Sequence, residues 1–74
     1  MDENITYGVY WQSKRSLIPY EWHRFFDWLS VYEDAESMAR ELKRDPNCLA
    51  IKIVKRVETF EDVPGTLWER NNNE

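Results

Sequence analysis

The stretch SVYEDAESMARELKR, residues 30–44, predicts a helix around which the rest of the chain is organised. Its apolar residues recur at helical spacing and form one stripe: Ala35, Met38, Ala39 and Leu42. Acidic residues gather in the first turn and basic residues in the last, as the helix dipole favours. Ser30 and Glu33 have the spacing of a capping box, so we expect the helix to begin at Ser30. Asp45-Pro46-Asn47 should end it, because the residue before a proline resists helical geometry.

Two strands are expected before this helix and one after it. Ile5–Trp11 alternates apolar and aromatic residues with others, and Tyr7, Val9 and Trp11 share one face. The polar and basic residues 12–16 then form the loop of a hairpin. Cys48–Val57 is the third strand, with Ile51 and Ile53 on the face that meets the helix.

The aromatic segment Tyr20–Leu29 is interpreted as the second strand. In that register one face of the segment meets the helix and the other does not. The residues expected toward the helix are Trp22, Phe26 and Trp28, and those expected on the other face are His23, Phe25 and Asp27. A slip of one residue would exchange the two faces. A helix is the alternative, because several aromatic residues also match helical spacing.

The predicted fold class is therefore α+β. A three-stranded antiparallel sheet in the order β-β-α-β has the helix packed on one face and a C-terminal tail beyond it. The 74 residues form a single domain, because two cores would not fit in so short a chain. We expect an ordered core over about residues 4–68 and a frayed end at Asn71–Glu74.

The composition indicates where in the cell the protein is expected and which classes of partner it is expected to bind. The chain is 42% hydrophobic and 15% aromatic, enough for a packed core. It has no apolar run near the ~20 residues that cross a bilayer, and its first four residues are polar and acidic, unlike a secretory signal. We therefore expect a cytoplasmic protein with no membrane partner. A net charge of −4 argues against a dedicated duplex-DNA binder.

Few catalytic chemistries suit this composition. The chain has one cysteine, Cys48, one histidine, His23, and only two glycines. These numbers exclude an intramolecular disulfide, multi-cysteine zinc patterns and a glycine-rich phosphate loop. The adjacent carboxylates Glu33-Asp34 and Glu61-Asp62 are interpreted as a dipole partner and a solvated turn. We expect a protein that is not an enzyme and that needs neither cofactor nor metal.

The sheet face away from the helix carries more aromatic and basic residues than a solvated face needs. The C-terminal tail, a second copy of the chain or a different macromolecule could cover it. Aromatic and arginine side chains dominate interface energetics, so we expect the binding residues to be Tyr10, Phe25, Lys52, Arg56 and Trp68. Such a face could also stack the bases of single-stranded nucleic acid or RNA. No RNA-recognition consensus is present.

Ser30–Ala39, preceded by two aromatic strands and followed by Leu49–Val54, resembles small orphan proteins of bacteriophages and prophages. The resemblance covers roughly residues 5–57. In layout the chain is similar to the phage inhibitor of bacterial RNA polymerase and to some anti-CRISPR proteins. The resemblance lies in the layout, so no functional residue is carried over from it.

The resemblance implies a small inhibitor or regulator that binds a host enzyme or defence complex in the host cytoplasm. A single-strand or RNA-binding module and a structural homo-oligomer are the alternatives. A homodimer is compatible with the first and the last of these functions.

Overall fold

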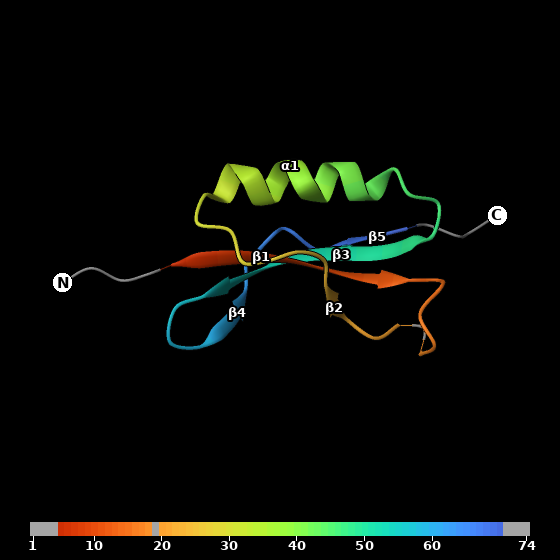
Figure 1. Ribbon diagram of the computed structural model, residues 1–74, viewed down its shortest axis with the longest axis horizontal. Helices are drawn as coiled ribbons and strands as arrows, with labels where there is room; N and C mark the ends of the chain where they lie inside the picture. Colours follow the sequence, from red (N-terminus) through yellow and green to blue (C-terminus); the bar gives the residue numbers. More distant parts are fainter. Residues whose placement is uncertain (1–4, 19, 71–74) are drawn as a thin grey trace.

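The computed structural model describes residues 5–18 and 20–70 and has an α+β fold with one helix and an antiparallel sheet (Figure 1). The predicted fold class is therefore confirmed at this level. The elements, in chain order, are β1 (Thr6–Ser13), β2 (His23–Arg24), α1 (Tyr32–Lys43), β3 (Cys48–Arg56), β4 (Phe60–Asp62) and β5 (Trp68–Glu69).

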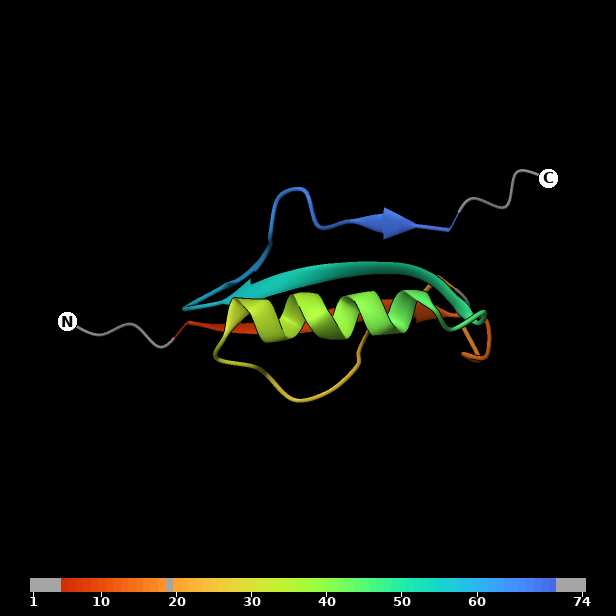
Figure 2. The same ribbon diagram turned by 90° about the horizontal axis from the view of Figure 1, so that it is seen from above.

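The sheet has five strands, so the prediction of three is wrong. Its order is β2-β1-β3-β4, and β5 also pairs with β3. β1 pairs along one edge of β3, while β4 and β5 follow one another along its other edge (Figure 2). The expected tail thus supplies two strands, because β3 is long enough to pair with both. The expected ordered core reaches residue 4, which, like the expected frayed end 71–74, lies outside the described residues.

A threonine hydroxyl bridges the gap between β4 and β5. The Ile53 backbone N–H donates to Thr66 Oγ1 at 3.1 Å, and Thr66 Oγ1 in turn donates to the Val63 carbonyl at 2.7 Å. The turn at Gly65, whose φ of 79° suits glycine, carries the chain past this point. The β3 backbone therefore keeps a hydrogen-bond partner at the point on its second edge where neither β4 nor β5 lies beside it.

The core lies between α1 and one face of β1 and β3. Val9 is paired with Ile53 and Trp11 with Ile51, so these side chains share a face. Val9, Ile51 and Ile53 form one buried cluster with helix residues Ala35, Ala39 and Leu42, and Trp11, partly buried, packs against it. In Figures 1 and 2 the helix lies along β1 and β3 on that side of the sheet. Val9 and Trp11 of the first strand thus share a face with Ile51 and Ile53 of the third, as the alternation predicts.

The helix begins one residue later than the capping box predicts. Val31 is the N-cap, in an extended conformation, and no side chain caps the helix. Leu29 exchanges two backbone hydrogen bonds with Tyr7, at 2.6 and 2.8 Å. The first helical carbonyl belongs to Val31, which accepts from Asp34.

The second strand is much shorter than predicted. Only His23–Arg24 pair continuously with β1, and the chain returns to the sheet at Leu29. The Phe25 N–H donates to Val9 at 2.8 Å, so three residues, 26–28, stand opposite the single residue Gly8. The excess length forces these residues out of the ladder, as in an extended bulge.

Candidate functional site

The sheet face opposite α1 carries an array of aromatic rings and cations, which we call the open face. Tyr10 is paired with both Arg24 and Lys52, and Arg56 with Phe60, so these side chains point to the same side. The open face comprises Tyr10, Trp22, Arg24, Trp28, Lys52, Arg56 and Phe60. No helix or further strand of the described chain lies across it (Figure 1). Its floor is nevertheless covered, because Ala50 and Val54, which share this face with Lys52, are buried.

Trp28 lies over a glycine at the centre of this face. A Cβ atom on Gly8 would be only 2.8 Å from Cζ3 of Trp28, so the ring occupies the space that a side chain would need. The bulge at residues 26–28 brings the tryptophan here from outside the ladder. The Trp28 ring is also 6.1 Å from the ring of Tyr10 and 5.5 Å from that of Phe60. Trp28 is thus the residue around which the open face is arranged.

Cations cover the tryptophans of the open face. The guanidinium carbons of Arg56 and Arg24 lie 4.4 and 5.2 Å from the centroid of the Trp28 ring. The ammonium of Lys52 is 4.6 Å from the Trp22 ring and 3.2 Å from the Asp62 carboxylate. Each cation–π contact contributes about 0.5–1 kcal/mol at exposed sites. These contacts hold the charged groups in fixed positions on the face.

The structure separates the five residues predicted to bind. Tyr10, Lys52 and Arg56 lie together on the open face. Phe25 lies on the helix side, with its ring 5.6 Å from that of Trp11, and Trp68 is also on that side because it pairs with Ile51. The placement of Phe25 on the far face is therefore wrong.

The cause is the register of the second strand, which is offset by one residue from the predicted one. Trp22, Arg24 and Trp28 consequently lie on the open face, so the prediction that Trp22 and Trp28 face the helix is also wrong. Phe60 was not among the predicted binding residues, although the tail that carries it was one of the three candidates to cover this face. A glycine inside a strand often marks a close approach, so Gly8 was the available signal for Trp28.

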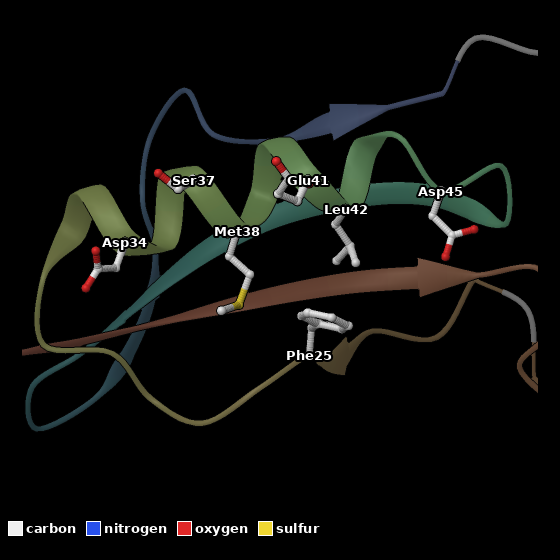
Figure 3. A pocket seen from close by; sticks show the side chains of 7 residues that line it. All are labelled: Phe25, Asp34, Ser37, Met38, Glu41, Leu42 and Asp45. Atoms are coloured by element: carbon white, nitrogen blue, oxygen red, sulfur yellow. The ribbon is translucent and has the colours of Figure 1, made fainter.

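A groove opens on the other side of the sheet, between α1 and the segment that follows β2 (Figure 3). Its volume is about 470 Å³. Met38 and Leu42 point from the helix toward Phe25 and form an apolar floor. The other lining residues are Asp34, Ser37, Glu41 and Asp45. The described lining contains three carboxylates and no lysine or arginine.

His23, Ser16 and Glu21 form the group nearest to a catalytic arrangement. Ser16 Oγ is 3.0 Å from Nε2 of His23, and the Glu21 carboxylate is 3.7 Å from the same nitrogen. A hydrolytic triad places the serine and the carboxylate on different ring nitrogens, so that the acid orients the base toward the nucleophile. Because both groups meet Nε2, this geometry does not supply that relay.

Cys48 is buried in the core at the start of β3. Burial raises the pKa of its thiol, and the nearby Arg70 guanidinium lowers it by a smaller amount. A nucleophilic cysteine needs the opposite shift. Across residues 5–18 and 20–70, no three histidine, cysteine or carboxylate side chains lie close enough to hold a metal ion. The described part of the chain also has no helix with the length and hydropathy of a membrane span.

Comparisons of this chain with models of protein families, with curated proteins and with solved structures find no match.

Proposed function

We propose that this protein is a small non-enzymatic inhibitor or regulator that binds another protein through its open face. The single observation that supports this function is the array of aromatic rings and cations on a sheet face across which no described helix or further strand lies. Phe60, with 65% of its surface exposed, supplies apolar area at the edge of the array. Aromatic residues and arginine are the side chains that most often dominate binding energy.

The chemistry of the face favours an acidic partner surface. A guanidinium that stacks on a ring through its flat face keeps its in-plane N–H groups available as donors. Arg24 and Arg56 lie over the Trp28 ring, and Arg24 Nε already donates to the Phe26 carbonyl at 2.9 Å. The donors offered to carboxylates, beside the exposed ring of Phe60, are therefore the terminal N–H groups of Arg24 and the guanidinium of Arg56. Bidentate hydrogen bonds between an arginine and a carboxylate are among the stronger hydrogen bonds in interfaces. The partner we propose is a protein with carboxylates around a small apolar patch.

A protein partner fits better than single-stranded nucleic acid. Bases need free aromatic faces on which to stack, and both tryptophans of the open face already have cations over their rings. Lys52 is also paired with Asp62. The net charge of −4 opposes a phosphate backbone at longer range. In keeping with the resemblance to bacteriophage proteins, we propose a host enzyme or defence complex in the cytoplasm as the partner.

The test is a capture experiment from nuclease-treated bacterial lysate over a series of salt concentrations. The wild-type chain is compared with an open-face variant, Arg24→Glu/Phe60→Ser, and a matched control, Arg40→Glu/Leu67→Ser. Both variants change one exposed arginine and one exposed apolar residue, since Leu67 is 59% exposed. The control residues lie on α1 and before β5, outside the open face.

We expect a stoichiometric protein band with the wild type and the control, and at least a tenfold weaker band with the open-face variant. A band retained equally by all three chains would assign binding to another surface. Recovery of nuclease-sensitive material alone, with affinity that falls steeply as salt rises, would replace the protein partner with nucleic acid. If no macromolecule is retained, the proposed function is wrong for the proteins of that lysate.

A further inference from the structure

The groove beside α1 has a definite chemical character, distinct from that of the open face. Its floor is apolar, and its carboxylates follow the helix from Asp34 to Asp45. Asp34 lies in the first turn of α1 and Asp45 just beyond its last residue, Lys43, so the carboxylates flank the groove over nearly the whole length of the helix. Glu41 makes only a surface ion pair, 3.8 Å from Arg44. An occupant of this groove needs exposed apolar side chains next to basic ones.

The loop after β1 has that composition. Lys14 and Arg15 are exposed, Leu17 is 100% exposed and Ile18 is 61% exposed. The base of the loop is held in place, because the Lys14 N–H donates to the Asn47 carbonyl and the Arg15 N–H donates to the Ser13 hydroxyl. The loop extends past the end of β1 in Figure 1. A fully exposed leucine on an anchored loop gains the most from being covered by a partner.

We propose that the groove of one copy of this chain binds the Lys14–Ile18 loop of a second copy. Leu17 and Ile18 would cover the floor formed by Met38, Leu42 and Phe25, while Lys14 and Arg15 would face the carboxylates of the rim. The two surfaces are opposite in charge and each carries exposed apolar area. The loop of the same copy does not fill the groove, because Leu17 contacts none of the surrounding described chain closely enough to lose exposure.

The other segments of this chain fit the groove less well. Met1–Asn4 carries two carboxylates and residues 71–74 carry one, the same sign of charge as the rim. Loop and groove are different surfaces, so the contact is head-to-tail and leads to a closed ring or an open chain of copies. The groove and the open face lie on opposite sides of the sheet. Self-association is therefore independent of the binding proposed above.

Sedimentation velocity of the purified chain tests the proposal with two complementary variants. The loop variant, Leu17→Ser/Ile18→Ser, keeps its groove, and the groove variant, Ser37→Arg/Glu41→Arg, keeps its loop. All four side chains are exposed, so the melting temperature should change little. Wild type should show a mass that rises with concentration, and each variant should remain a monomer. Loss of Leu17 alone should weaken association at least about tenfold.

The decisive sample is an equimolar mixture of the two variants. One intact loop and one intact groove remain, so the mixture should form a 1:1 dimer and nothing larger. In parallel, a dilution series of wild-type amide spectra should show concentration-dependent shifts at residues 14–18 and 34–45, and this measurement needs no variant. A wild-type chain that stays monomeric up to millimolar concentration overturns the proposal. Association that both variants retain, or shifts confined to other residues, overturns it as well.

Discussion

Replacement of Gly8 by alanine tests the contact between Gly8 and the Trp28 ring. The contact decides whether the substitution raises or lowers the free energy of unfolding. A glycine in a strand interior ordinarily costs stability, and alanine at a compatible position gains about 0.4–1 kcal/mol by restricting the unfolded chain. Gly8 does not have a positive φ, so its backbone suits alanine. With no obstacle above the glycine, Gly8→Ala should therefore stabilise the protein.

The position of Trp28 reverses this expectation. The new Cβ would be 2.8, 3.1 and 3.3 Å from three atoms of the indole ring, closer than carbon atoms pack. The ring cannot move freely, because Arg56 and Phe60 lie against it at 4.4 and 5.5 Å. Overpacking of this kind costs about 1–3 kcal/mol. After the gain of alanine is offset, we expect a net loss of about 1–2 kcal/mol. In a domain of this size the melting temperature should fall by roughly 4–15 °C.

The assay is chemical unfolding followed by far-UV circular dichroism, in the wild-type background and in a Trp28→Ala background. Circular dichroism is preferred to fluorescence because one of the four tryptophans is altered. Without the indole ring, Gly8→Ala should gain about 0.4–1 kcal/mol. The two backgrounds should thus differ by a coupling energy of about 1.5–3 kcal/mol. A stabilising Gly8→Ala in the wild-type background, or an equal effect in both, would refute the contact.

Three further predictions concern Arg70 and Cys48, which meet where the Arg70 side chain donates to the Cys48 carbonyl. The Arg70 side chain donates to the carbonyls of Cys48, Lys43 and Asp45, at 2.8, 3.1 and 3.0 Å, so Arg70→Ala should lower stability by about 2–3 kcal/mol in urea unfolding. Arg70→Lys should recover little of this, because one ammonium cannot replace the planar fork; full recovery would contradict the role of the three bonds. The Cys48 thiol should react with iodoacetamide only as fast as the chain unfolds, and rapid labelling under native conditions would contradict its burial. Its raised pKa favours the folded state below the thiol's ordinary pKa of ~8.5, so that part of the stability should be lost as pH rises above this value and should be absent in Cys48→Ala.

Local patterns in the sequence were sufficient for the helix and for the two central strands. The stripe through Ala35, Ala39 and Leu42 and the alternation in β1 and β3 arise because each element buries one face. The same alternation placed Tyr10, Lys52 and Arg56 on a common face. These features depend only on the period of each element and on which side meets the core.

Pairing between segments far apart in the chain decided the bulge after β2, the strands of the tail and the groove. The bulge at residues 26–28 follows from the pairing of Leu29 with Tyr7, which no local pattern in residues 20–31 reveals. The strands of the tail exist because β3 has a free edge, and the groove exists because Phe25 turned toward the helix.

By itself, the sequence determined the fold class, the helix, the two central strands and the faces of those strands. The spacing of apolar residues within each element shows which of its faces is buried. Only the tertiary structure decided the register of residues 22–28, the strands of the tail and the meeting of Trp28 with Gly8 and Arg56. A shift of one residue in pairing costs nothing in local propensity, but it moves every side chain to the other face. The composition of the open face and of the groove was therefore set by contacts between segments far apart in the chain.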